Sequence, residues 1–477
     1  MLFNSPLFLF WFLPTVLTLY VLTPIHGRNG LLLLASLFFY VWGEPYNYWV
    51  LIMAIIGNLI IGRKLEACRA ARPNNGKKWL TFGILLNCCG LFYYKYSYFV
   101  LENLIKVCEF LNKDFWADPN QNVHLPMGIS FFTFQSIAYL IDVYRGICPA
   151  QVSLLQLGLF LSLFPKISQG PILRWSNLAL EWKDRALQLT DWSDGLRRFI
   201  IGLGKKVLIA NTLGVASNQI MVTPGVDLSP ALAWIGAICY TLQIYYDFSG
   251  YTDMALGISL VFGFKLPENF NYPYAAHNIQ NFWHRWHITL SSWFRDYVYI
   301  PLGGNRVSQL RTYVNLIVVF LLTGIWHGTK WNFIVWSLFH GLFLVLERLG
   351  LARILERLWQ PVSHLYTMTV VTVSWVFFRI ENLDQAWDYV RAMFALEANS
   401  TLKHQPSMYL HREEWLFLAI GALFAMPILP YLANQLHDNL SRPIFESLRG
   451  LAMFGILAIS VLYTASSTYS PFIYFRF

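Results

Sequence analysis

Charged residues are scarce in this sequence of 477 residues. Only 13% of the residues are Asp, Glu, Lys or Arg, whereas 56% are hydrophobic and 17% are aromatic. Soluble domains carry roughly 25% charged and 45–50% apolar residues. The composition therefore excludes an ordinary soluble enzyme and is typical of a protein that crosses a membrane several times.

Several chemical signatures are also lacking. The six cysteines show no metal-ligand spacing and imply no disulfide framework. No Gly-x-Ser-x-Gly motif is present, so Ser249 and Ser291 have little support as nucleophiles. The net charge is +9, but no basic domain lies outside the apolar segments, which argues against a nucleic-acid partner.

Apolar segments with few charges recur along the whole chain. A spanning helix needs about 20 mostly apolar residues, and shorter segments are tilted, buried or re-entrant. The expected spans are residues 7–24, 30–42, 46–62, 79–97, 127–143, 153–165, 198–218, 229–246, 313–329, 331–346, 363–378, 415–434 and 449–466. The sequence predicts an all-α polytopic membrane protein, a single domain over residues 1–477 with roughly 10–12 helices.

Basic residues cluster between the expected spans. They fill a loop at residues 63–78 and flank the span at 198–218. The positive-inside rule places these clusters in the cytoplasm and the N-terminus outside. Residues 181–194 are predicted to form an amphipathic interfacial helix, and residues 381–411 a short surface helix followed by a loop.

Residues 248–311 have a different composition. They combine charge, glycine, proline and aromatic residues, and Pro and Gly punctuate them. Their basic residues place the flanks of this block towards the cytoplasm. We expect short helices that dip into the protein from that side.

Histidine residues stand out among the tryptophans of this block and the span after it. A charged group in the centre of a membrane costs about 2.5–3.5 kcal/mol, so an ionisable residue there indicates a site. His327 follows Trp326 at the end of an apolar segment. A buried neutral imidazole can accept a proton. The alternative is a core histidine that bonds a backbone carbonyl.

His284 and His287 are three residues apart, which places both on one face if the segment is helical. With His327 or His340 they could chelate a metal. The alternative is a polar face turned to water, and we predict no metal because no acidic or cysteine ligand completes the set. We interpret His340 as a packing histidine that bonds a neighbouring helix.

Three aspartates could orient a histidine as the third member of a triad: Asp247, Asp253 and Asp296. We favour the alternative, in which each pairs with a nearby basic residue, for example Asp296 with Arg295. Residues 303–305, Gly-Gly-Asn, predict a tight turn.

An ordered set of motifs resembles the membrane-bound O-acyltransferase family, in the bacterial branch that contains the membrane subunit of alginate O-acetylation. The motifs are residues 126–135, 141–146, 170–172, 247–251, 267–270, 286–291, 293–297, 301–305, 326–328 and 472–475. The branch commonly has Arg where this chain has His284. That difference predicts weaker or pH-dependent contacts with the phosphates of a donor.

The resemblance implies a fold and a set of site residues. The fold is a bundle of about eleven transmembrane helices with re-entrant helices around a central tunnel. The motif-rich catalytic core spans about 124–347, and C-terminal helices occupy about 363–477. His327 and His287 are the expected catalytic histidines. The expected substrate-binding residues are Arg285, Trp286, Asp296 and Trp326.

The resemblance also implies the reaction. Acetyl-CoA is the expected cytoplasmic donor, no cofactor is bound, and a periplasmic or extracellular polysaccharide such as alginate is the acceptor. The expected setting is the lipid of the bacterial inner membrane, with an SGNH-hydrolase-like acetyltransferase as the partner outside. The alternatives are D-alanyl transfer, peptidoglycan O-acylation, and a non-enzymatic transporter or flippase.

Overall fold

A computed structural model describes residues 1–71, 73–111, 123–178, 188–396 and 404–466. Within those ranges every regular element is a helix, which confirms the all-α prediction. The chain divides into two compact units, and the single membrane domain stays a prediction. The first unit comprises residues 1–188 with 259–266, and the second comprises residues 189–258 with 267–477.

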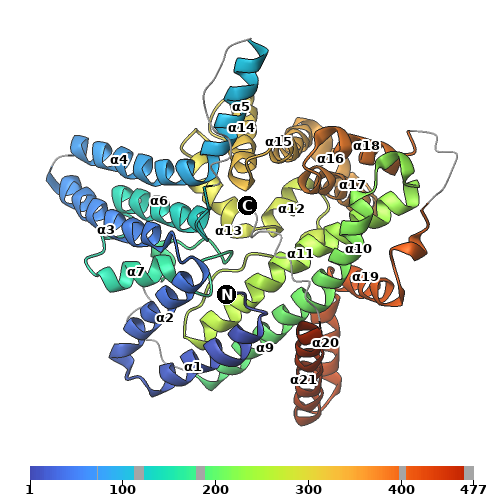
Figure 1. The fold of residues 1–477 in the computed structure, drawn as a ribbon, viewed down its shortest axis with the longest axis horizontal. Coiled ribbons are helices and arrows are strands. Elements are labelled where there is room, and N and C mark those ends of the chain that lie inside the picture. The colour runs from blue at the N-terminus through green and yellow to red at the C-terminus, as the bar shows by residue number, and fades with distance from the viewer. Residues whose placement is uncertain (72, 112–122, 179–187, 397–403, 467–477) are drawn as a thin grey trace. The chain divides into compact units, whose positions relative to one another are not determined.

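The first unit is built from eight α-helices in its described residues. They are α1 (Leu13–Leu22), α2 (Arg28–Gly43), α3 (Tyr48–Ala71), α4 (Pro73–Leu91), α5 (Ser97–Phe110), α6 (Ile129–Arg145), α7 (Leu154–Ser162) and α8 (Trp175–Leu178). Helices α3, α4 and α6 pack side by side (Figure 1). The prediction of a loop at residues 63–78 is wrong, because α3 continues to Ala71 and α4 starts at Pro73. Its Ala, Arg and Lys residues favour helix, and proline fits a first helical turn.

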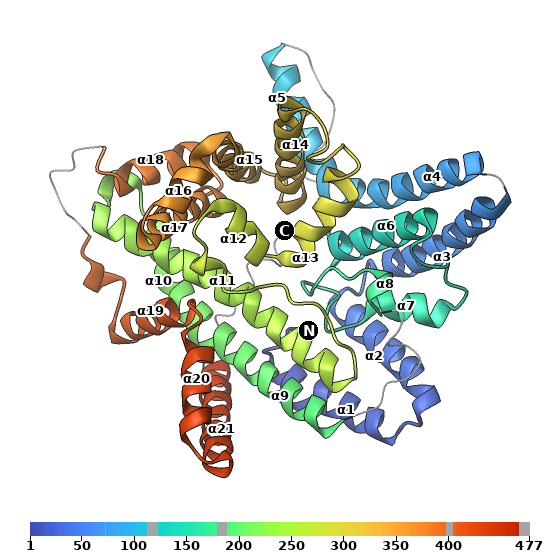
Figure 2. The same cartoon turned by 180° about the vertical axis from the view of Figure 1, so that it is seen from behind.

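The second unit holds the histidine-containing segments. Its α-helices are α9 (Leu189–Gly204), α10 (Asn211–Val222), α11 (Pro230–Val261), α12 (Ile279–Arg285), α13 (Ile288–Phe294), α14 (Gln309–His327), α15 (Trp331–Leu346), α16 (Ala352–Arg357), α17 (Gln360–Arg379), α18 (Leu383–Met393), α19 (Arg412–Phe424), α20 (Ile428–Asn439) and α21 (Arg442–Ser466). Helix α9 runs beside α11 (Figures 1 and 2). A Cβ atom on Gly202 would lie 2.6 Å from the carbonyl oxygen of Gly250, so glycine permits this close approach.

Five helical segments in the described residues are long and apolar enough to cross a membrane. They are Leu189–Val222, Gln309–His327, Trp331–Arg357, Gln360–Arg379 and Arg442–Ser466. Helices α19 and α20 bend by 74° and give a sixth span if they act as one. The sequence predicts more spans because it also admits helices shorter than 18 residues, such as Phe8–Leu22.

Helix α11 extends beyond the span predicted at residues 229–246. It passes through Asp247 and Asp253 without a break. The Lys206 Nζ atom lies 2.5 Å from Asp247 Oδ1, and Lys205 Nζ lies 2.7 Å from Asp253 Oδ2. Because both carboxylates are paired with lysines of the neighbouring helical segment, charge does not end the helix.

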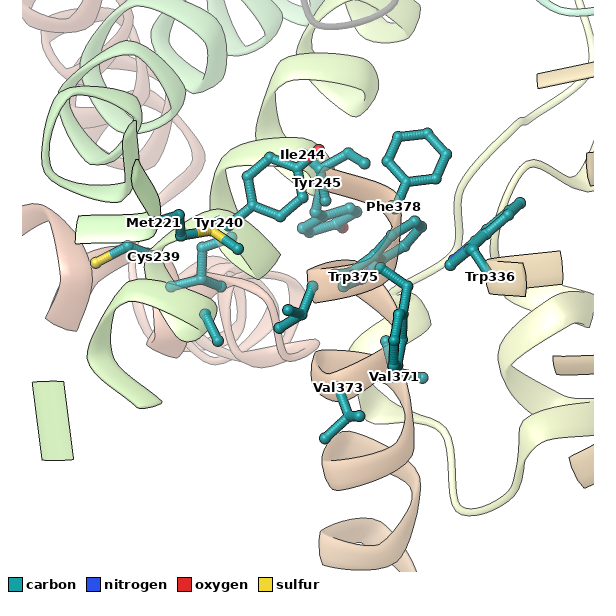
Figure 3. Packing of buried hydrophobic residues seen from close by; sticks show 14 of the residues in the cluster. Met221, Cys239, Tyr240, Ile244, Tyr245, Trp336, Val371, Val373, Trp375 and Phe378 are labelled. Carbon is teal, nitrogen blue, oxygen red and sulfur yellow. The ribbon is translucent and has the colours of Figure 1, made fainter. Parts of the chain in front are cut away.

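Aromatic side chains fill the core of the second unit. The rings of Trp336 and Trp375 stack with centroids 5.6 Å apart, and Phe378 lies edge-on to both (Figure 3). Helices α14 and α15 approach closely at Gly324, where a Cβ atom would lie 2.8 Å from the carbonyl oxygen of Phe333. That approach carries His327, one turn later, against α15.

The two predicted surface segments have different outcomes. Helix α18 confirms the short surface helix, and the Asn382 side chain caps it by accepting from the backbone N–H groups of Asp384 and Gln385. Part of the segment predicted at 181–194 lies outside the described residues, and α9 begins at Leu189. The motif at residues 472–475 also lies outside them.

Candidate active site

His287 occupies the junction between two short helices. Helix α12 ends at Arg285, and His287 precedes α13 with φ 43° and ψ 54°, a left-handed conformation that is uncommon outside glycine. His284 is exposed and His287 is buried, so the prediction of one shared helical face is wrong. The described residues contain no group of three His, Cys, Asp or Glu side chains that could hold a metal ion.

Asn269 fixes the orientation of the His287 ring. The Asn269 Oδ1 atom lies 3.0 Å from His287 Nδ1, and it also accepts hydrogen bonds from the Thr289 backbone N–H and hydroxyl. A carbonyl oxygen only accepts, so the network assigns the imidazole proton to Nδ1. The Nε2 atom keeps its lone pair and has no hydrogen-bond partner among the described residues.

Burial keeps His287 neutral. Its side chain is 0% exposed, and desolvation lowers the pKa of His287 to about 3. Phe248 packs edge-on against the ring, with centroids 4.8 Å apart. The result is an unprotonated nitrogen in a dry site, which is the form a proton acceptor requires.

His327 lies in the same aromatic core. It is the last residue of α14 and is 2% exposed. Its ring centroid lies 4.7 Å from that of Trp326 and 4.9 Å from that of Trp336. The Trp326 ring is in turn 6.1 Å from His287, so both histidines contact one indole.

The contacts of His340 confirm the prediction that it is a packing histidine bonded to a neighbouring helix. It is buried in α15, and its Nε2 atom lies 2.9 Å from the Ser374 hydroxyl on α17. The Ser374 hydroxyl donates to the carbonyl oxygen of Val371, so His340 Nε2–H is the donor in the first bond. The bond ties α15 to α17 beside Trp336, whose centroid is 5.5 Å from His340.

Comparison with known proteins identifies the family. The sequence profile of the membrane-bound O-acyltransferase family matches residues 149–378. The probable alginate O-acetylase of Azotobacter vinelandii is 37% identical to this chain over the full length of both. The chain belongs to the membrane-bound O-acyltransferase family. It is therefore an O-acyltransferase and, with its apolar helices, a multi-pass membrane protein.

Two further relatives have similar levels of identity. The probable alginate O-acetylase of Pseudomonas aeruginosa is 41% identical over 83% of this chain and 75% of its own length. The peptidoglycan O-acetyltransferase of Helicobacter pylori is 35% identical over 100% of this chain and 98% of its own. Both histidines and Asn269 fall inside the segment that the family profile matches.

The four predicted substrate-binding residues lie in different settings. Arg285 is half-buried, and it donates to Asn281 Oδ1 at 2.9 Å and to the Asn271 carbonyl oxygen at 3.1 Å. Trp286 is buried in the aromatic core, with its ring centroid 5.0 Å from that of Trp375. Asp296 pairs with the Arg295 guanidinium through both of its oxygens. The Trp326 ring contacts both histidines.

The aspartates pair with basic residues, as the favoured alternative predicts. The residue that orients His287 is instead an amide, Asn269, whose role its sequence pattern does not predict. Its place in the motif at residues 267–270 was the only signal. The turn at residues 303–305 is confirmed, because Gly303 and Gly304 both have positive φ angles.

Proposed function

We propose that this O-acyltransferase moves an acetyl group from cytoplasmic acetyl-CoA to the hydroxyl of an extracytoplasmic polysaccharide, with alginate as the acceptor. The observation that carries the proposal is a pair of buried histidines, His287 and His327. Both rings contact Trp326 in an aromatic core. The relatives named alginate O-acetylases support the choice of polymer.

The proposed chemistry uses a neutral imidazole as the base. His327 accepts a proton from the attacking hydroxyl, which belongs to the acceptor or to an intermediate carrier, while the new C–O bond forms at the thioester carbonyl. The C–S bond then breaks, and the leaving thiolate takes the proton from the imidazolium. Rings around His327, including Trp326 and Trp336, exclude the water that would hydrolyse the acyl group. Asn269 holds His287 in one tautomer beside this base.

The proposal includes the membrane architecture of the family. About eleven crossing helices with re-entrant elements would surround a tunnel in the bacterial inner membrane. The seven-residue helices α12 and α13 and the bent pair α19–α20 support re-entrant geometry. An SGNH-hydrolase-like acetyltransferase outside the membrane would complete transfer to the polymer.

The direct test is acetyl transfer by the full chain in lipid nanodiscs, with labelled acetyl-CoA, the extracytoplasmic partner and alginate oligomers. His327→Ala should lower the transfer rate about 10²- to 10⁴-fold, because a positioned base contributes that much. His437→Ala, at an exposed histidine of α20, is the matched control and should leave the rate unchanged. Normal transfer by His327→Ala would contradict the assignment.

Peptidoglycan is a second candidate acceptor, and a parallel assay tests it. The relative named peptidoglycan O-acetyltransferase covers the whole chain, so peptidoglycan fragments should replace alginate in one arm. A D-alanyl carrier protein should replace acetyl-CoA in another. In sealed proteoliposomes, label that enters the lumen without reaching any acceptor would instead favour a transporter.

A further inference from the structure

A cavity of about 480 Å³ lies in the second unit, separate from the paired histidines. Helices α12 to α15 line it. Its wall combines apolar side chains, such as Trp283, Leu316 and Phe320, with the polar side chains of Ser291, Ser292 and Thr323. Its basic residues are His284, Arg295 and Arg348. The described residues that line it include no Asp or Glu. This combination of apolar side chains and a basic rim suits an anionic amphiphile.

The basic rim is built by specific contacts. Asn305 Oδ1 accepts from the Tyr299 hydroxyl at 2.5 Å and from Arg348 Nη1 at 2.9 Å, which orients the Arg348 guanidinium. Arg295 is held by Asp296, with Nε 2.7 Å from Oδ1 and Nη2 3.1 Å from Oδ2. Asp296 offsets part of the Arg295 charge, so Arg348 is the principal cation of the rim.

The cavity lies along two membrane spans, α14 and α15, and its basic rim is at one end of them. Helix α14 begins at Gln309 beside basic residues, and the Arg348 rim immediately follows the end of α15. The positive-inside rule places this end in the cytoplasmic leaflet. From there the apolar wall continues along α14 through Leu316 and Val319. A lipid bound here would have its headgroup at the rim and its chain along the span.

Trp283 lines the cavity and links it to the aromatic core. Its ring packs against Phe320 and Trp336, with centroids 5.3 Å and 5.9 Å away. Trp336 in turn contacts His327, so the indole rings of Trp283 and Trp336 lie between the cavity and that histidine. The Trp283 side chain is only 8% exposed, and its indole N–H has no hydrogen-bond partner among the described residues.

We propose that this cavity binds an anionic phospholipid of the cytoplasmic leaflet. The phosphodiester contacts Arg348 and Arg295, and an acyl chain packs on Leu316 and Val319. A thioester donor fits less well, because its acetyl group would have to pass Trp283 and Trp336 to reach His327. The inference is independent of the acceptor proposed above.

The experiment measures phospholipid binding by native mass spectrometry of the full chain, with phosphatidylglycerol and phosphatidylcholine as probes. Arg348→Gln should weaken phosphatidylglycerol binding about tenfold, because one charge-assisted contact with phosphate is lost. Phosphatidylcholine binding should change less. The control is Arg353→Gln, which removes an exposed charge of α16 outside the cavity lining and should leave both affinities unchanged.

A second pair of variants tests the apolar wall. Val319→Trp fills the cavity and should abolish the preference for phosphatidylglycerol, whereas Val314→Trp, at an exposed position of α14 outside the lining, should not. Equal phosphatidylglycerol binding in wild type, Arg348→Gln and Val319→Trp would overturn the proposal. Displacement of phosphatidylglycerol by coenzyme A would also overturn it and would reassign the cavity to the donor. Neither result depends on the His327→Ala assay.

Discussion

At the scale of single residues, an amide takes the place that an aspartate has in a catalytic triad. Asn269 accepts from His287 Nδ1–H and from two groups of Thr289, so one oxygen fixes a ring and the start of α13 together. His287 itself has a left-handed backbone, with φ 43°. Such strain is maintained only where the surrounding contacts enforce it.

Asn269→Leu should lower acetyl transfer roughly 10- to 100-fold, because the orienting partner of a functional histidine is lost. Asn269→Asp keeps the acceptor and should retain most of the rate. Its carboxylate should also raise the pKa of His287, which moves the acid limb of the pH–rate profile to higher pH. A wild-type pH profile in Asn269→Asp, together with a normal rate in Asn269→Leu, would remove Asn269 from the site.

His287 should also make stability depend on pH. Its pKa is about 3 in the fold against 6.5 in the unfolded chain, so the unfolded state binds more protons between these values. The free energy of unfolding should therefore fall by about 1.4 kcal/mol for each pH unit below 6.5. Thermal unfolding at pH 6.5 and near pH 5 measures this fall.

Two variants isolate that contribution to the pH dependence. His287→Gln should flatten the decline in melting temperature over this range, since it removes the titrating group. His437→Gln, at an exposed histidine, should keep the wild-type slope. If melting temperature fell equally with pH in the wild type and both variants, His287 would not be a buried neutral imidazole.

At the scale of elements, the contact between α14 and α15 positions His327. Gly324 lies one turn before His327 and against the backbone of Phe333. The bond between His340 and Ser374 then ties α15 to α17, whose Phe378 also contacts the His327 ring. Three helices therefore set the position of one imidazole.

Gly324→Ala should destabilise the protein by about 1–3 kcal/mol, because a Cβ atom 2.8 Å from the Phe333 carbonyl oxygen forces the helices apart. Thermal unfolding in detergent measures the loss, and acetyl transfer should fall with it. Gly450→Ala in α21 meets no atom within 4 Å and should be neutral or slightly stabilising. Equal melting temperatures for the two variants would contradict the close packing.

At the scale of the whole molecule, membrane orientation decides which substrate reaches which end of α14. The start of α14 lies at its basic end, while His327 lies at the other, near the Lys330–Glu381 pair. By the positive-inside rule the basic end faces the cytoplasm. We therefore predict that His327 lies in the half of the span that faces away from the cytoplasm.

Cysteine labelling tests this orientation. In a variant with the natural cysteines changed to serine, Ser308→Cys should react with a membrane-impermeant maleimide only after the cells are opened. Glu381→Cys should react in intact cells, because it lies at the opposite end of the spans. Both positions are exposed, so access to water does not distinguish them. The reverse pattern would invert the topology.

Sequence alone determined the class of this protein and its main chemical groups. Scarcity of charge and long apolar segments dictate helices in lipid, since every backbone polar group there must be bonded within its own segment. The histidines, the ordered motifs and the tight turn at residues 303–305 are equally local features. Tertiary structure decided the rest, including the Asn269–His287 bond, the uninterrupted α11 and the cavity at Arg348. These depend on which distant side chains pair inside the fold, and hydropathy and spacing do not record such pairing.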